Sequence, residues 1–155
     1  MSTYERATLA EVIATKGIRP GAKAMLTVLQ TRTGKHPGRD PKVDGIYNKR
    51  PIRGSQTIWS THAVSRGIDL GMKVDANGQQ LGNFLLVVLL SKAEALGIQQ
   101  IIWNDGKSDV AYRPGSVPSR MKTQNHKNHL HIEITKHMAD SPQWAAEKWI
   151  NGVLG

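Results

Sequence analysis

Three of the six histidines in the sequence, His126, His129 and His131, lie within a stretch of seven positions. From Leu130 to Ile134, apolar residues alternate with polar ones, and His131 has the same parity as His129. This alternation predicts a β-strand with one buried apolar face and the two histidines side by side on the other face. Imidazoles held on a strand can bind a metal ion or transfer protons. The alternative is a half-exposed strand whose histidines have no chemical role.

A second set of reactive side chains, His62 and Asp69, lies in the stretch STHAVSRGID at residues 60–69. The spacing fits neither one helical turn nor one face of a strand, so we expect a tight loop, which Ser65 and Gly67 permit. The chain has no cysteine, which leaves His, Asp and Glu as ligands for a cation such as Zn²⁺. With one histidine of the later strand, this stretch predicts a site of two histidines and one aspartate. Three protein ligands leave a fourth position open, which is typical of catalytic zinc.

The charge of the chain is unevenly distributed. Residues 1–66 carry a net charge of +8 and residues 67–155 a net charge of +1. Such an excess predicts an anionic partner, either nucleic acid or an anionic bacterial cell wall. The N-terminus lacks the pattern of a signal peptide, and the longest apolar run, Phe84 to Leu90, is too short to span a bilayer. We therefore expect no membrane insertion.

The elements that must position these residues suggest one α+β domain over residues 1–155. We expect a small antiparallel sheet that carries the metal site, with helices packed on one of its faces. Residues 1–34 would form N-terminal packing helices, and residues 53–134 the core that bears the motifs. The expected elements are a helix over 2–17 that begins with a capping box at Ser2 and Glu5, a helix over 20–34, a helix over 79–96, a strand over 98–103, and a last helix after Ser141 and Pro142 that carries Trp144 and Trp149.

Two long segments have little periodicity and are expected to be loops. Residues 35–53 are rich in Pro, Gly and basic side chains, and the stretch from Arg32 to Arg53 holds seven Lys and Arg residues against two aspartates. Residues 104–125 are polar and punctuated by Gly and Pro. Long loops in a compact domain are often functional, although a solvated, mobile loop is the alternative for the first segment.

With both motifs in view, the sequence resembles the zinc peptidases of the D-alanyl-D-alanine carboxypeptidase group, which includes murein endopeptidases and the hedgehog signalling domain. Their first motif is Ser-x-His-x-x-Gly-x-Ala-x-Asp, and residues 60–69 match it with Ser65 in place of Gly and Gly67 in place of Ala. The murein endopeptidase branch continues with His-x-x-His-x-His, which residues 126–131 match. The resemblance covers about residues 53–134.

This resemblance implies roles for individual residues. His62, Asp69 and His131 would be the zinc ligands, and His129 would handle protons during attack on a peptide carbonyl, with support from His126. Many relatives place a catalytic Glu three positions before the last ligand, where this chain has an asparagine. A transition-state-stabilising arginine lies upstream of the first motif in these relatives. Here the candidate for it is Arg53, with Arg50 and Gln56 as alternatives.

The function implied is a zinc-dependent peptidase that hydrolyses peptide bonds of bacterial peptidoglycan, as a carboxypeptidase or an endopeptidase. Its partners would be peptidoglycan and anionic cell-wall polymers, with no nucleic acid, and we expect a monomer. Without a signal peptide the chain resembles a phage-type lysin, which acts after release by another factor or is carried in a virion.

Two other functions are compatible with the sequence. Asn125-His126 and Asn128-His129 resemble a His-Asn-His nuclease, and the positive charge would attract phosphates. A metal-dependent nuclease leaves the 60–69 motif unexplained. The other alternative is a non-catalytic, zinc-containing module that binds the cell wall, which would need neither His126 nor His129.

Overall fold

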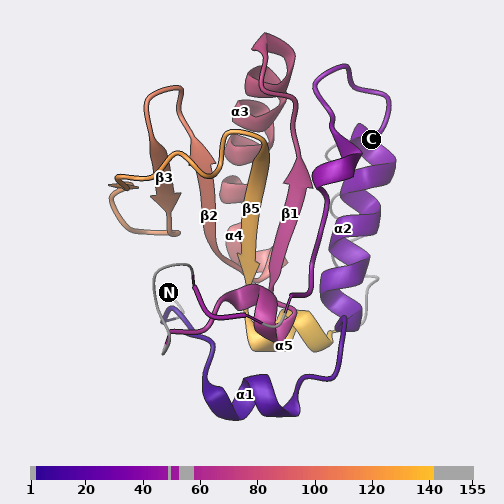
Figure 1. Ribbon diagram of the computed structural model, residues 1–155, viewed down its shortest axis with the longest axis vertical. Coiled ribbons are helices and arrows are strands. Elements are labelled where there is room, and N and C mark those ends of the chain that lie inside the picture. The colour runs from indigo at the N-terminus through magenta and orange to yellow at the C-terminus, as the bar shows by residue number, and fades with distance from the viewer. Residues whose placement is uncertain (1–2, 49, 53–57, 142–155) are drawn as a thin grey trace.

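Five β-strands form one antiparallel sheet in the computed structural model of the protein, which describes residues 3–48, 50–52 and 58–141 (Figure 1). In space the strands follow the order β1-β5-β2-β3-β4, and their bounds are β1 Gly67–Gly71, β2 Ile98–Asn104, β3 Asp109–Tyr112, β4 Ser119–Arg120 and β5 His129–Ile134. The last strand in the chain, β5, pairs with both β1 and β2. This order brings the histidine strand next to the strand that carries Asp69. The expected α+β class and antiparallel sheet are confirmed.

The helices cover the face of the sheet that carries the alternating apolar residues. Their bounds are α1 Leu9–Ala14, α2 Pro20–Thr33, α3 Ala76–Ser91, α4 Ala93–Leu96 and α5 Lys136–Asp140, with short 3₁₀ helices η1 Pro41–Val43 and η2 Thr61–Val64. Figure 1 shows α3 behind the sheet and α2 beside β1. Leu130, Ile132 and Ile134 of β5 are fully buried in the core that α2, α3, α4 and α5 form with the sheet, whereas α1 packs against η2 in a separate, smaller cluster. No helix among the described residues is long and apolar enough to cross a membrane.

The predicted first helix is shorter than the capping box suggested. Helix α1 begins at Leu9, and Thr8 caps it by accepting a hydrogen bond from the Glu11 N–H at 3.2 Å. Before it, the backbone of Glu5 exchanges two hydrogen bonds with the Gln99 side chain of β2, both at 3.0 Å. These contacts replace the first helical turn, and the predicted start at Ser2 lies outside the described residues. Helix α2 is confirmed where it was expected.

The predicted apolar helix over 79–96 is two helices. Helix α3 begins three residues earlier because Asp75 caps it, accepting from the Gly78 N–H at 2.8 Å. It ends before Lys92, and α4 follows until Gly97 adopts a left-handed conformation with φ 64°. The short α5 was not predicted, and the predicted helix with Trp144 and Trp149 lies outside the described residues.

The prediction of a loop over 104–125 is wrong in part, because this segment adds two strands to the sheet. In β3, Val110 pairs with Trp103 of β2 and with Arg120 of β4. Both strands are short, and neither shows the apolar–polar alternation that would predict a strand. The predicted strand over 98–103 is confirmed as β2.

The buried Arg66 ties α1 to the sheet. Its guanidinium is completely buried and binds both carboxylate oxygens of Glu11 at 2.9 and 3.0 Å, and the carbonyls of Glu5 and Ile134 at 3.1 Å. Paired donors and acceptors make such a buried charge tolerable. Through Arg66 the N-terminal segment is held against the end of β5.

The second face of β5 is also covered, which the alternation did not predict. His131 and Glu133 are 6% exposed, and only His129 at the start of the strand is half-buried. Tyr4 contributes to this cover, because its hydroxyl reaches Glu133. The interpretation of β5 as a half-exposed strand is therefore wrong.

Candidate metal centre

The three predicted zinc ligands meet where β1 lies beside β5. Asp69 and His131 are directly opposite each other in the antiparallel register. Residues in such positions have their side chains on the same face of the sheet. His62 lies in η2, just before β1, and the Ser60 side chain caps this helix by accepting from the His62 N–H at 3.2 Å.

The chain reaches Asp69 from His62 through a turn at Ser65. This residue has a left-handed backbone with φ 54°, and its Oγ accepts a hydrogen bond from the Arg19 N–H at 2.8 Å. At Gly67 a Cβ would lie 3.2 Å from His131 Cε1, so the absence of a side chain leaves room for the imidazole. The predicted tight loop is present, and Ser65 and Gly67 have separate parts in it.

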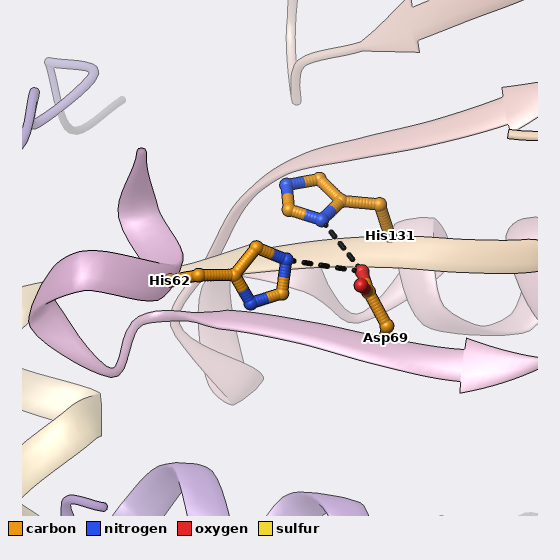
Figure 2. Close-up of side chains that lie close together, drawn as sticks. All are labelled: His62, Asp69 and His131. Atoms are coloured by element: carbon orange, nitrogen blue, oxygen red, sulfur yellow. Dashed lines mark hydrogen bonds and ion pairs between the residues drawn. The ribbon is translucent and has the colours of Figure 1, made fainter. Parts of the chain in front are cut away.

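The nitrogens of both histidines converge on one carboxylate oxygen (Figure 2). Asp69 Oδ1 lies 3.2 Å from His62 Nε2 and 2.9 Å from His131 Nδ1. One ligand atom from each of the three residues lies within 4.8 Å of the others. His62 and His131 are nearly buried, and the Asp69 side chain is 22% exposed. The group is therefore compact and open on one side.

The second ring nitrogen of His62, Nδ1, is held by the chain segment that precedes His62. His62 Nδ1 donates to the carbonyl of Ile46 at 2.8 Å, so Nε2, the nitrogen that faces Asp69, is the one that could bind a cation once it carries no proton. The neighbouring Gly45 exchanges two backbone hydrogen bonds with Asp69, at 3.1 and 2.8 Å. Outer contacts of this kind fix the tautomer and orientation of a metal-binding histidine.

A buried ion pair anchors that supporting segment to the end of β1. Arg39 binds both oxygens of Asp44, at 3.0 and 2.7 Å, and also reaches the Gly71 carbonyl. Asp44 in turn accepts from the Gly71 N–H at 2.7 Å and from the Gln30 side chain at 2.9 Å. The described part of the predicted loop over 35–53 is thus pinned to the sheet. A solvated, mobile loop is not what the structure contains over 39–46.

The second ring nitrogen of His131 is held by a different segment. Glu133 Oε1 lies 3.0 Å from His131 Nε2, and the Tyr4 hydroxyl donates to Glu133 Oε2 at 2.5 Å. Glu133 is 6% exposed. The structure therefore places this glutamate behind His131, where it holds the second ring nitrogen.

The opposite charges of Asp69, His131 and Glu133 stabilise one another. Burial raises the pKa of Asp69, but hydrogen bonds from His131 and His62 outweigh it and hold that pKa well below its ordinary value. Burial lowers the pKa of His131, but Asp69 and Glu133 outweigh it and raise that pKa to about 10. At neutral pH the metal-free His131 is therefore an imidazolium between two carboxylates. A metal cation at Nδ1 would replace one proton by another positive charge.

His129 lies beside the three ligand candidates without joining them. Its Nε2 is 3.7 Å from Asp69 Oδ1, and its Nδ1 is 2.7 Å from Asn128 Oδ1. Burial lowers the pKa of His129 to about 4, more than the nearby Asp69 raises it. His129 is therefore neutral at pH 7 and able to accept a proton.

His126 completes a group of histidine rings around the site. Its centroid lies 4.8 Å from that of His129 and 5.6 Å from that of His131. His126 Nδ1 is 2.8 Å from a carboxylate oxygen of Asp109, a fully buried residue of β3. Burial lowers the pKa of His126, and the hydrogen bond with Asp109 opposes this shift.

The structure describes one of the three candidates for the transition-state-stabilising residue. Arg53 and the alternative Gln56 lie outside the described residues. Arg50 is half-buried, and its guanidinium donates to the Pro51 carbonyl at 3.3 Å. The structure assigns none of the three to the site.

Sequence reasoning missed Tyr4, Ile46 and Asp109, which hold the ring nitrogens or their partners. Each comes from a segment that carried no chemical motif, and Ile46 acts through its backbone. No local signal marked Asp109, because Asp109-Val110-Ala111-Tyr112 shows no apolar–polar alternation.

The donor set fits zinc. Two imidazoles and one carboxylate are ligands that zinc accepts in catalytic sites, and each imidazole has its other nitrogen occupied by the protein. The assignment of His62, Asp69 and His131 as ligands stays a prediction. Comparison of the chain with models of protein families, with curated proteins and with solved structures gave no match.

Proposed function

We propose that the protein is a zinc-dependent peptidase that hydrolyses peptide bonds of bacterial peptidoglycan. The observation that carries the proposal is the convergence of His62 Nε2 and His131 Nδ1 on Asp69 Oδ1, with the opposite ring nitrogens already bound by Ile46 and Glu133. This arrangement leaves one nitrogen per imidazole to bind a cation once the proton on that nitrogen is released. The sequence motif that resembles zinc peptidases of cell walls contains these same three residues.

The chemistry divides among the residues of the site. Zinc, when bound, would supply Lewis-acid polarisation of a peptide carbonyl and would make a water nucleophilic near neutral pH. His62, Asp69 and His131 would hold the cation, and their outer partners would keep them in place. His129, neutral and next to the triad, would accept a proton from the attacking water and return it to the leaving amine. Positioned acid–base catalysis of this kind contributes roughly 10²–10⁴ in rate.

The proton-handling residue also separates this proposal from a purely structural zinc site. A structural site has four protein ligands and is closed. Here three ligand candidates form a group with a partly exposed aspartate, and His129 Nε2 lies 3.7 Å from that aspartate. A neutral histidine beside an open coordination position supports catalysis rather than binding alone.

The proposed substrate class rests on charge and on the sequence resemblance. Residues 1–66 carry a net charge of +8, and Lys35 and Lys42 of the segment next to His62 are exposed. Cell walls carry carboxylates and often phosphodiester polymers, which such a surface attracts. The peptide stems and cross-links of that polymer are the bonds we expect to be cut.

Incubation of the zinc-loaded protein with purified sacculi tests the proposal. We expect soluble muropeptides with new amino termini, identified by mass spectrometry, and we expect a chelator to abolish their release. His131→Ala serves as the matched control without the ligand. Plasmid DNA in parallel tests for a nuclease, and chelator-sensitive cleavage of DNA with intact sacculi would overturn the proposal. Sacculus binding without any hydrolysis would indicate the non-catalytic module instead.

A further inference from the structure

A buried carboxylate lies next to the histidine group and is not part of the ligand set. Asp109 in β3 is completely buried, and its side chain collects five hydrogen bonds. Three come from its neighbours other than the histidine, namely Asn104 Nδ2 at 3.0 Å, Thr123 Oγ1 at 2.6 Å and the Asn125 N–H at 3.0 Å. The other two come from His126, through its N–H at 3.1 Å and its Nδ1 at 2.8 Å. A carboxylate with so many donors stays ionised although it is buried.

These contacts determine the state of the His126 ring. Burial raises the pKa of Asp109, but its hydrogen bonds lower the pKa to about 2, so the carboxylate accepts and does not donate. His126 Nδ1 must therefore carry a proton when it faces Asp109. In the neutral imidazole, Nε2 then has the lone pair, and among the described residues it has no hydrogen-bond partner. The segment before β5 is fixed at the same time, because the backbone of His126 is bound to the same carboxylate.

The position of the His126 ring places its Nε2 beside the other histidines of the site. The His126 ring centroid lies 4.8 Å from that of His129 and 5.6 Å from that of His131. A carboxylate that orients an imidazole and fixes its tautomer is the arrangement by which hydrolases prepare a histidine to accept a proton. His129, in contrast, has the neutral amide oxygen of Asn128 behind it.

We propose that Asp109 is a positioning residue, which holds His126 in the Nδ1–H tautomer so that His126 Nε2 is presented to a substrate beside His129. The role toward substrate rests on the proposed peptidase function. The tautomer and its dependence on Asp109 do not, because they can be measured without any substrate. His126 and His129 then form a pair of proton-accepting groups, and only His126 has a carboxylate behind it.

Nuclear magnetic resonance of the ¹⁵N-labelled imidazoles tests the positioning directly. We expect His126 in the zinc-loaded protein to show a protonated Nδ1 and an unprotonated Nε2 that is not bound to metal. Asp109→Asn should add the Nε2–H tautomer, because an amide can turn its N–H₂ toward Nδ1. Thr123→Val removes another donor to the same carboxylate and should leave the His126 tautomer unchanged. An Nε2–H tautomer in the unaltered protein, or zinc bound at Nε2, would overturn the inference.

Kinetics on sacculi tests the role toward substrate. We expect His126→Ala and Asp109→Asn each to lower turnover by roughly 10²-fold with zinc content unchanged. The double variant should be no worse than the poorer single variant, because both changes remove one unit. Multiplying losses, or full turnover in His126→Ala, would overturn the role. Thr123→Val, which keeps the Asp109 carboxylate and its contact with His126, should lower turnover less than Asp109→Asn does.

The outcomes separate the two proposals. If the unaltered protein does not hydrolyse sacculi, the proposed function fails and the role of His126 toward that substrate fails with it, while the spectra still decide what Asp109 does. If Asp109→Asn does not fold, the spectrum of the unaltered protein and the turnover of His126→Ala still decide the inference.

Discussion

Two segments of irregular backbone flank the candidate metal centre, and each is built around a buried aspartate. In residues 35–48 the aspartate is Asp44, whose main partner is the cation of Arg39. In residues 104–128 it is Asp109, whose partners are neutral donors and an imidazole. The first segment uses its Ile46 carbonyl to hold a ligand candidate, and the second uses its carboxylate to hold a histidine that is not one.

The difference shows that a buried aspartate can have a structural role in one segment and an electrostatic role in the other. A buried carboxylate must be saturated with donors, and both aspartates are, so both segments are rigid at that point. An internal arginine neutralises Asp44, so this pair presents no charge to the site and its role is mechanical. No lysine or arginine of the described residues pairs with Asp109, so its charge acts on His126. We therefore expect changes in the first segment to affect stability and metal binding, and changes in the second to affect turnover.

The largest effect on zinc binding and turnover should come from removing a ligand candidate, and removing a neighbouring histidine is the comparison. His131→Ala should lose zinc and turnover together, because it removes a ligand. Its melting temperature should fall as well, because zinc bound to the folded protein stabilises the fold. His129→Ala should keep zinc and the melting temperature, while turnover on sacculi falls roughly 10²-fold or more. Elemental analysis, thermal unfolding and hydrolysis are measured on both variants. Loss of zinc from His129→Ala with retention in His131→Ala would reverse the assignment.

Zinc binding should depend steeply on pH because of the proton on His131. The pKa of about 10 in the metal-free protein means that Nδ1 must release a proton before it binds a cation at any lower pH. The apparent zinc affinity should therefore rise with pH, by about tenfold per unit between pH 6.5 and 8.5. Calorimetry in buffers of different ionisation enthalpy counts the protons released. A pH-independent affinity, or no proton release at pH 7.5, would contradict the charge balance described for His131.

Removal of one partner from the buried pair tests the mechanical role of the first segment. Asp44→Ala leaves the Arg39 charge buried and unpaired, and should lower the free energy of unfolding by about 3–5 kcal/mol. Zinc affinity should fall as well, since the anchored segment carries the Ile46 carbonyl that holds His62. Asp40→Ala is the matched control, because it also removes one aspartate charge from the same segment, at a half-buried position. Zinc affinity that survives Asp44→Ala unchanged would show that the segment does not support His62.

The contrast between these residues also explains what the sequence could and could not predict. His62, Asp69 and His131 are marked by local patterns, and the alternation in β5 and the apolar strand β2 place the histidine strand in a sheet. The supporting contacts join distant parts of the chain, and Tyr4 and Glu133 are 129 positions apart. No local pattern specifies such a pair. A capping box at the same N-terminus even predicted a helix at Tyr4, where the structure has none.

Charge gives another case in which local pattern was insufficient. Arg39 and Lys42 contribute alike to the basic composition of residues 35–53, yet Arg39 is 5% exposed and Lys42 is on the surface. Likewise Asp109 looked like one polar residue in a loop, because β3 is only four residues long. Burial of a charged side chain depends on partners that the folded chain supplies, so composition alone cannot separate the two cases.

A smaller effect should come from the contact behind His131. Tyr4→Phe removes the hydroxyl that binds Glu133 Oε2 and should lower zinc affinity about tenfold, the lower end for loss of an outer contact at a metal site. The fold should survive, because the ring and its stacking under Arg113 remain. Tyr112→Phe removes the same atom from another half-buried tyrosine, on β3, and should leave zinc affinity unchanged. Equal losses in both variants would mean that the hydroxyl of Tyr4 has no specific role.

The smallest effect on the rate of hydrolysis should come from neutralising the exposed lysines of the two segments. Lys35 and Lys42 of the first segment and Lys107 and Lys122 of the second are all exposed. Because residues 1–66 carry most of the excess charge, Lys35→Gln with Lys42→Gln should lower the rate on sacculi several-fold at low salt, and more than the same changes at Lys107 and Lys122. The difference should vanish at high salt, since exposed charges are screened over about 10 Å at 0.1 M. Turnover of a short soluble stem peptide should be the same in all variants, because the inward Arg39 and Ile46 contacts remain. A parallel loss on the soluble peptide would show that these lysines contribute to the active site rather than to attraction by the wall.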